Sequence, residues 1–224
     1  MAKNDRSPCA SQVVVLGLGR FGASLALELV RRGSEVLGLD SDPVLVQRYA
    51  DDLTHAAVAD TTDAEALQQL DVPDFSRAVV GIGTNLEASI LTTAVLVDLG
   101  IPHIWAKATS RQHGRILERI GAHHVVLPEF DMGERVAHLV TGRMIDYIEF
   151  EDDFAMVKTA APREILDRPL SASGVRARHG ITVVAVKRPG EEFTYATPDT
   201  VLHSGDVLIV SGRINQVEAF ADLT

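Results

Sequence analysis

Short apolar runs alternate with longer amphipathic runs from Val13 to about residue 144. The first apolar run, VVVLGLG, predicts a buried strand. A helix is predicted over 20–32, because Phe21, Leu25 and Leu29 recur at four-residue spacing. The same reasoning predicts strands at 35–40, 55–60, 78–83, 103–108 and 123–128, and helices after Pro43 and at 63–70, 85–99, 110–120 and 131–144. This alternation predicts an α/β fold with a doubly wound, mostly parallel sheet.

The alternation of strand-type and helix-type runs ends near residue 145. After the acidic segment EFEDDF, shorter β-type runs follow at 154–160, 181–188, 193–197 and 206–212. The dipeptide Pro189-Gly190 predicts a hairpin turn between two of them, and LSASGVRARH and INQVEAFADL are helical candidates. We therefore expect a flexible tail over 1–11, a larger α/β domain over 12–145 and a small α+β domain over 150–224.

The amino-acid composition argues against several classes of function. The chain has 31 acidic and 21 basic residues, a net charge of −10, and no Lys/Arg-rich run, which argues against nucleic-acid binding. The single cysteine, Cys9, excludes an intramolecular disulfide and a cysteine metal cage. No apolar run approaches the roughly 20 residues of a membrane-spanning helix, and the start lacks the apolar core of a secretory signal. These features predict a cytoplasmic protein.

A glycine motif, Gly17-Leu18-Gly19-Arg20-Phe21-Gly22, follows the first strand and opens the first helix. In such a motif Gly17 permits a tight turn, Gly19 lets the backbone approach phosphates, and Gly22 lets the helix pack on the strand. Asp40, at the end of the second strand, is placed to hold ribose hydroxyls. Aspartate rather than arginine there favours ATP, ADP or NAD over NADP.

Arg20 lies in the first helical turn, where the helix dipole disfavours a cation by a few tenths to about 1 kcal/mol. A bound di- or triphosphate would reverse that sign. Such an arginine therefore indicates a polyphosphate ligand, and the alternative is a solvated surface arginine.

Further candidates lie where strands end, at the edge that binds ligands in these folds. Asp60 and Thr61 could meet an adenine, and the ammonium of Lys107 could reach phosphate oxygens. Glu129 beside phosphates would be repulsive without a divalent cation, so it is either linked to a metal or an ordinary acid at a helix start. The complete set of predicted ligand-binding residues is Gly17, Gly19, Arg20, Phe21, Gly22, Asp40, Ser41, Asp60, Thr61, Gly83, Thr84, Asn85, Lys107 and Glu129.

Nothing in the sequence indicates catalysis. A nicotinamide dehydrogenase needs a substrate domain with an acid/base group, but the segment after 145 is small. Its histidines, His179 and His203, have no accompanying carboxylate or nucleophile in the sequence pattern. We therefore expect a protein that is not an enzyme and that senses a nucleotide rather than turning it over.

Five stretches together resemble the KtrA/TrkA family: VVVLGLGRFGASLALEL, EVLGLDSD, GTNLEASILTTAVLVDLGIPHIWAKA, ILERIGAHHVVLPEFDMGERVA and VRARHGITVVAVKRPGEEFTYATPDTVLHSGDVLIVSG. This family comprises cytosolic RCK-domain regulatory subunits of potassium uptake systems. The resemblance runs from about Ser11 to the end and is closest to the KtrA branch. It implies a Rossmann-like RCK-N domain followed by a small RCK-C domain.

The resemblance also implies a mode of action. Family members form dimers that assemble into a ring, an octamer, beneath a KtrB/TrkH-like membrane potassium channel or transporter subunit at the inner face of the membrane. ATP favours the conducting state and ADP the closed state. By motif match, Arg20 corresponds to the γ-phosphate arginine, and Glu129 to a glutamate associated with a divalent cation such as Mg²⁺.

The C-terminal segment adds a second ligand. In some family members this domain binds cyclic di-AMP, and the matching positions here are Val175, Arg176, Ala177, Ile181 and Pro198. An alternative interpretation of Arg176 is a solvent-exposed residue on a helix that binds no ligand. Asp42 departs from the asparagine of several KtrA proteins. That departure leaves the selectivity between ATP, ADP and NAD open. Two alternative functions also stay open, an NAD/NADH-responsive redox sensor of the TrkA type and a true oxidoreductase.

Overall fold

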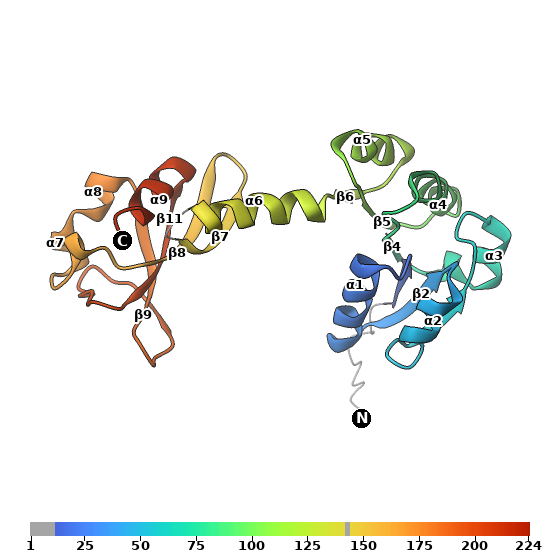
Figure 1. Cartoon of the computed structure of the whole chain (residues 1–224), viewed down its shortest axis with the longest axis horizontal. Coiled ribbons are helices and arrows are strands. Elements are labelled where there is room, and N and C mark those ends of the chain that lie inside the picture. Colours follow the sequence, from blue (N-terminus) through green and yellow to red (C-terminus); the bar gives the residue numbers. More distant parts are fainter. Residues whose placement is uncertain (1–11, 142–143) are drawn as a thin grey trace, which may run out of the picture. The chain divides into compact units, whose positions relative to one another are not determined.

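The computed structural model describes residues 12–141 and 144–224, so the predicted tail over 1–11, with Cys9, lies outside the described residues. Contacts within the chain divide it into two compact units (Figure 1). Unit 1 ends at Glu129, and unit 2 begins at Phe130. Each unit has its own hydrophobic core and is described by itself.

Unit 1 contains a six-stranded parallel sheet with the order β3-β2-β1-β4-β5-β6. Its strands are β1 (Gln12–Leu16), β2 (Glu35–Asp40), β3 (His55–Val58), β4 (Arg77–Val80), β5 (His103–Lys107) and β6 (His124–Val126). The strand order reverses between β1 and β4. This confirms the predicted doubly wound fold, in which ligands bind where the strand order reverses.

Helices cover both faces of this sheet. Val13 and Val15 of β1 pack in one cluster with α1 (Arg20–Arg31) and α2 (Pro43–Tyr49). Val14 and Leu16 point the other way, into a cluster with helices that follow β3, β4 and β5. These are α3 (Ala64–Gln69), α4 (Leu86–Asp98) and α5 (Arg111–Ile120), and a short 3-10 turn spans Val72–Asp74. Because successive strand residues face opposite sides, one apolar strand supplies both core layers.

Local sequence sets where several helices begin. The side chains of Asp42, Asp63, Asn85 and Ser110 each accept a hydrogen bond from a backbone N–H in the first turn of the following helix. Such residues satisfy donors that have no partner inside the helix. Helix α1 differs, because its N-cap is Gly19 and no side chain caps it.

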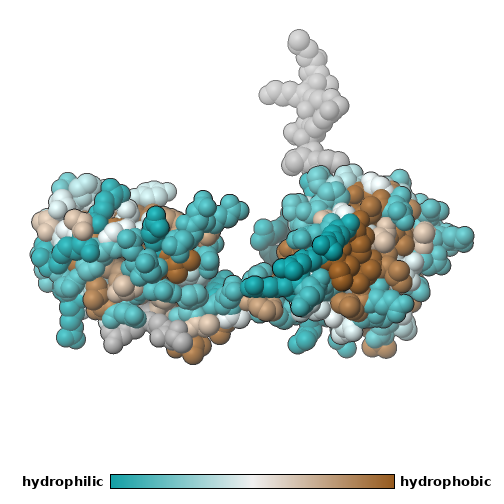
Figure 2. All heavy atoms as spheres, turned by 90° about the horizontal axis from the view of Figure 1, so that it is seen from above, coloured by the Kyte–Doolittle hydropathy of each residue, from teal (hydrophilic) through white to brown (hydrophobic). Residues whose placement is uncertain are grey.

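Helix α4 is apolar on more than its buried side. Leu86 and Leu91 are about half exposed, as is Ile116 on the adjacent α5. Figure 2 shows hydrophobic residues gathered in a patch over the part of unit 1 where α4 and α5 lie. An exposed apolar patch of this kind is typical of a surface that contacts another protein.

Unit 2 contains a five-stranded antiparallel sheet with the order β10-β9-β11-β8-β7. Its strands are β7 (Met144–Phe150), β8 (Phe154–Ala160), β9 (Thr182–Lys187), β10 (Phe193–Tyr195) and β11 (Val207–Arg213). The predicted hairpin at Pro189-Gly190 is present, with Gly190 at φ +82°. These strands and the helices below form the predicted small α+β domain.

One strand was not predicted, one predicted helix begins and ends earlier in the chain, and another is divided in two. β7 was not predicted, and the helix expected at 131–144 is α6 (Pro128–Thr141). The single helix expected over 170–179 is divided by Gly174, at φ +68°, into α7 (Leu170–Ser173) and α8 (Val175–His179). A 3-10 turn spans Arg163–Ile165, and α9 (Ile214–Ala221) packs against β8 and β11.

Candidate functional site

The glycine motif forms a tight turn between β1 and α1. Gly17 has φ +97°, and a Cβ there would lie 2.9 Å from Cγ1 of Ile82. A Cβ on Gly22 would overlap the carbonyl oxygen of Gly17. A Cβ on Gly19, in contrast, would meet no atom within 4 Å. Gly17 and Gly22 are therefore needed by the backbone itself, whereas Gly19 borders open space at the uncapped end of α1.

Asp40 binds this loop. Its Oδ2 accepts a hydrogen bond from the backbone N–H of Leu18 at 2.6 Å, and its Oδ1 accepts one from Asp42 at 2.9 Å. Each carboxylate oxygen has further acceptor capacity, so ribose hydroxyls could still donate to Asp40. The residue predicted to hold the ribose also holds the phosphate-type loop. Ser41, which follows it, is exposed.

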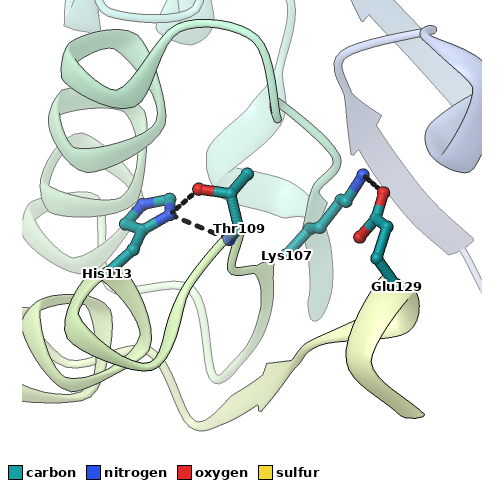
Figure 3. A network of polar contacts seen from close by, with 4 residues as sticks. All are labelled: Lys107, Thr109, His113 and Glu129. Carbon is teal, nitrogen blue, oxygen red and sulfur yellow. Dashed lines mark hydrogen bonds and ion pairs between the residues drawn. The ribbon is translucent and has the colours of Figure 1, made fainter. Parts of the chain in front are cut away.

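Three charged side chains from three elements gather near the start of α1. The Nζ of Lys107, at the end of β5, lies 2.7 Å from Oε1 of Glu129, at the start of α6 (Figure 3). The Lys107 side chain is only 12% exposed, whereas that of Glu129 is 66% exposed. The hydrogen bond from Lys107 lowers the pKa of Glu129, and the charge of Arg20 adds a smaller effect in the same direction. Lys107 also lies 5.6 Å from the ring centroid of Phe21.

The end of β4 adjoins this group. A Cβ on Gly83 would lie 3.2 Å from Nζ of Lys107 and 3.7 Å from Cγ2 of Thr109. Thr84 is exposed, and Asn85 caps α4 by accepting a hydrogen bond from the N–H of Ala88. Gly83 therefore lies against Lys107, and the Asn85 side chain has a structural partner.

The two predicted residues after β3, Asp60 and Thr61, lie in different surroundings. Asp60 is exposed, and the hydroxyl and backbone N–H of Thr62 both donate to its Oδ1, which lowers the pKa of Asp60. The hydroxyl of Thr61 is instead buried, 2.8 Å from that of Thr92 in α4. Of these two residues, Asp60 therefore presents its polar side chain to solvent and Thr61 does not.

Within the described residues, no group of three or more histidine, cysteine, aspartate or glutamate side chains could hold a metal ion. Divalent cations such as Mg²⁺ take about six oxygen ligands, and Glu129 offers one carboxylate that already contacts Lys107. The described residues of one chain therefore do not supply a complete set of metal ligands.

Sequence reasoning missed Thr109 and His113, which lie beside Lys107. His113 is 2% exposed, and its Nδ1 lies 3.3 Å from the backbone nitrogen of Thr109 (Figure 3). Ser110, three residues before His113, is the N-cap of α5. A Ser at the N-cap with a polar residue three positions later is the sequence pattern from which the contact of His113 with Thr109 could have been predicted.

In unit 2, the residues matched to a cyclic di-AMP site have mixed surroundings. Val175 and Ile181 are buried in the core, whereas Arg176 is exposed and donates to the hydroxyl of Thr182 at 2.9 Å. The carbonyl of Pro198 accepts a hydrogen bond from Ser171. Ala177 borders a hollow of about 390 Å³, which is also lined by Arg178, His179, Gly180, Asn215, Gln216 and Ala219.

The fold places a carboxylate beside each of His179 and His203, which the sequence pattern did not indicate. His179 Nε2 lies 2.9 Å from Oε1 of Glu164, and His203 Nδ1 lies 3.1 Å from Oδ1 of Asp167. Each pair joins segments far apart in the sequence. The sequence pattern could not reveal them, because only the fold of unit 2 brings the partners together.

Within the described residues, no helix is long and apolar enough to cross a membrane. Comparison with known proteins extends the structural findings. The TrkA-N domain family matches residues 13–128, and the TrkA-C domain family matches residues 154–224.

Curated relatives match nearly the whole chain. The Ktr system potassium uptake protein C of Bacillus subtilis (strain 168) is 38% identical over 210 residues, which cover 93% of this chain and 95% of that protein. The Ktr system potassium uptake protein A of Vibrio alginolyticus is 33% identical over 202 residues, covering 90% of this chain and 92% of that protein.

Among solved structures, the GsuK channel matches 98% of this chain with a TM-score of 0.68 and 18% identity. This chain covers only 40% of the GsuK channel, and 48% of the solved GsuK RCK domain, which it matches with a TM-score of 0.66. These likenesses support the fold. The family matches and the identity to curated relatives show that the chain belongs to the family of TrkA-N and TrkA-C domain proteins that includes the Ktr system potassium uptake proteins.

Proposed function

We propose that this protein is a cytosolic regulatory subunit that controls potassium uptake through a membrane channel or transporter subunit, and that it responds to ATP and ADP without turning them over. The observation that carries the nucleotide part is the uncapped start of α1, with Arg20 in its first turn and Lys107 nearby. The potassium part rests on the relatives, which are named potassium uptake proteins.

The charges at the start of α1 suit a polyphosphate. The first backbone N–H groups of a helix have no partner inside the helix and carry the positive end of its dipole, so they attract anions. Gly19 leaves open space there, and Arg20 and Lys107 supply two cations. A phosphate chain would also compete with Glu129 for Lys107, since the two lie 2.7 Å apart.

A γ-phosphate offers a physical basis for switching. A ligand shifts a conformational equilibrium only through its different affinities for the two states. ATP and ADP differ by one phosphate group, and Arg20 is our candidate for reading it. Glu129 could add one oxygen to a Mg²⁺ ion whose remaining ligands come from the nucleotide and from a second chain.

Association with other chains is the second part of the proposal. We expect dimers that form a ring, an octamer by family analogy, under a KtrB/TrkH-like partner at the inner face of the membrane. The apolar patch with Leu86 and Leu91 on α4 and Ile116 on α5 supports contact with another protein. Cyclic di-AMP is a further proposed ligand of unit 2, through Arg176 and its neighbours.

One alternative has an observation in its favour. Asp40 lies at the end of β2, where such folds hold a ribose, and that position serves NAD as well as ATP. The GsuK channel, whose NAD-bound structure shares 16% identity with this chain, has a similar fold. An NAD(H)-responsive regulator of the TrkA type is therefore the second candidate.

The test is calorimetric titration of the purified chain with ATP, ADP, NAD and NADH, with and without Mg²⁺, for wild type and Arg20→Ala. We expect ATP to bind most tightly, and Arg20→Ala to remove the advantage of ATP over ADP while leaving ADP binding nearly unchanged. Tightest binding of NADH, with no effect of Arg20→Ala, would replace this proposal with the alternative. Potassium uptake by vesicles holding the membrane partner, with ATP and with ADP, then tests the gating.

A further inference from the structure

His113 lies at the third position of α5 and closes an unusual capping arrangement. The N-cap residue, Ser110, accepts a hydrogen bond from the backbone N–H of His113 at 3.1 Å. In the reverse direction, the His113 ring reaches back to the residue before the N-cap, where Nδ1 lies 3.3 Å from the backbone nitrogen of Thr109. A capping box normally uses Glu or Gln at this third position.

The backbone N–H of Thr109 determines which nitrogen of the His113 ring carries the proton. A backbone N–H can only donate, so its contact with Nδ1 of His113 makes Nδ1 an acceptor and leaves the proton of the neutral ring on Nε2; the Thr109 hydroxyl, 3.4 Å from the same Nδ1, can donate to it as well. Nε2 is buried and has no hydrogen-bond partner among the described residues. A second proton would sit on Nδ1 and face the N–H of Thr109. Burial lowers the pKa of His113, which also favours the neutral form.

The segment that His113 contacts lies beside Gly83 at the end of β4. Thr109 comes two residues after Lys107, and both lie against Gly83, where an added Cβ would be 3.7 Å from Thr109 and 3.2 Å from Lys107. On its other side, Lys107 contacts Glu129 (Figure 3). Lys107 is itself paired with Val126 in the sheet, and the direction in which the chain then leaves β5 determines where the Thr109 backbone lies beside Gly83 and the Lys107 side chain.

We propose that His113 is a positioning residue for the nucleotide site: its neutral ring fixes the turn between β5 and α5 through the N–H of Thr109, and so places Lys107 toward the phosphates. The proposal rests on the proposed function, because it assigns His113 a role in the binding of ATP and ADP. His113 itself contacts no ligand in this scheme.

Two substitutions separate positioning from packing. His113→Asn keeps an acceptor at the place of Nδ1 but leaves space where the rest of the ring was. His113→Leu fills the space but removes the acceptor. His55→Leu is the matched control, because His55 is an exposed histidine at the start of β3, at the opposite end of the parallel sheet from Lys107.

Binding of ATP and of ADP to the full chain is measured by calorimetry, and stability by urea unfolding. We expect His113→Leu to weaken both nucleotides about tenfold, the effect of losing one hydrogen bond to an ordered segment. We expect His113→Asn to bind within about threefold of wild type, even where its unfolding midpoint is lower. His55→Leu should bind like wild type. If nucleotide affinity instead falls with the stability of each variant, so that His113→Asn binds more weakly than His113→Leu, the proposal is overturned.

A measurement on the wild type covers the case in which His113→Leu does not fold. Nitrogen chemical shifts of the His113 ring report which nitrogen carries the proton. The proposal requires a neutral ring with its proton on Nε2, and a Thr109 amide signal that shifts when ADP is added. A proton on Nδ1, or a Thr109 signal unaffected by a nucleotide that binds, overturns it. If the wild type binds none of ATP, ADP, NAD or NADH, the proposed function fails as well, whereas wild-type binding with an unaffected His113→Leu refutes this inference alone.

Discussion

Replacing Gly22 by alanine should damage the fold far more than the same change at Gly19, three residues earlier. At Gly22 the new Cβ would overlap the carbonyl oxygen of Gly17 and lie 3.0 Å from its carbonyl carbon, whereas real Cβ contacts essentially never fall below 3.0 Å. The start of α1 or the β1 turn would have to move by more than about 1 Å. Overpacking of a rigid core usually costs about 1 to 3 kcal/mol, and a backbone clash lies at or above the upper end.

Gly19→Ala is the matched control in the same loop. Gly19 has φ −64° and ψ −174°, which alanine adopts without strain, and no atom lies within 4 Å of the added Cβ. We expect it to change the free energy of unfolding by less than about 0.5 kcal/mol and yet to weaken nucleotide binding, because its methyl group enters the space beside the start of α1.

The assay is urea unfolding followed by circular dichroism, with the wild type as reference. We expect Gly22→Ala to lose about 3 kcal/mol or more of unfolding free energy. Equal unfolding midpoints for Gly22→Ala and wild type, or equal losses for Gly22→Ala and Gly19→Ala, would refute the close-packing argument for this loop.

Three further predictions concern single polar contacts. Glu129→Gln removes the carboxylate beside Lys107, and it should change the free energy of unfolding by less than about 1 kcal/mol, since the Glu129 side chain is 66% exposed. The same variant should strengthen ADP binding without Mg²⁺ in calorimetry. Weaker ADP binding would contradict this prediction. Burial lowers the pKa of His113 from 6.5, so the unfolded chain takes up that proton more readily and stability falls as the pH falls below about 6.5. Urea unfolding at about pH 7.5 and 5.5 should show a smaller loss for His113→Asn than for wild type, and equal losses would count against a neutral buried ring. Thr92→Val leaves the buried hydroxyl of Thr61 without its partner and should cost about 1 to 3 kcal/mol in urea unfolding, partly recovered in the double variant with Thr61→Val. No recovery in the double variant would show that the hydroxyl pair is not what matters there.

The sequence alone could reveal the elements that local pattern specifies. The β1-α1-β2 unit with its glycine motif was predictable, because an apolar run, a turn that needs glycine and a helical repeat are all short-range features. β7 was not predicted, because Asp146 and Glu149 interrupt its apolar residues without a regular alternation and the preceding helix was expected to continue to residue 144. Met144–Phe150 becomes a strand by pairing along β8, and that partner is not a local property.

Side-chain partners required the tertiary structure. Lys107 and Glu129 were each predicted at a strand end, but their contact depends on how the end of β5 and the start of α6 meet, 22 residues apart. Thr61 was expected at the ligand edge, yet its hydroxyl is buried against Thr92 in α4, because the direction of a side chain after a strand depends on the packing of the next helix. The sequence by itself determined the order of the unit 1 elements, the glycine loop and the charge type of each candidate residue. Only the tertiary structure decided which charges meet and which hydroxyls are buried, since these depend on contacts between segments that sequence periodicity does not relate.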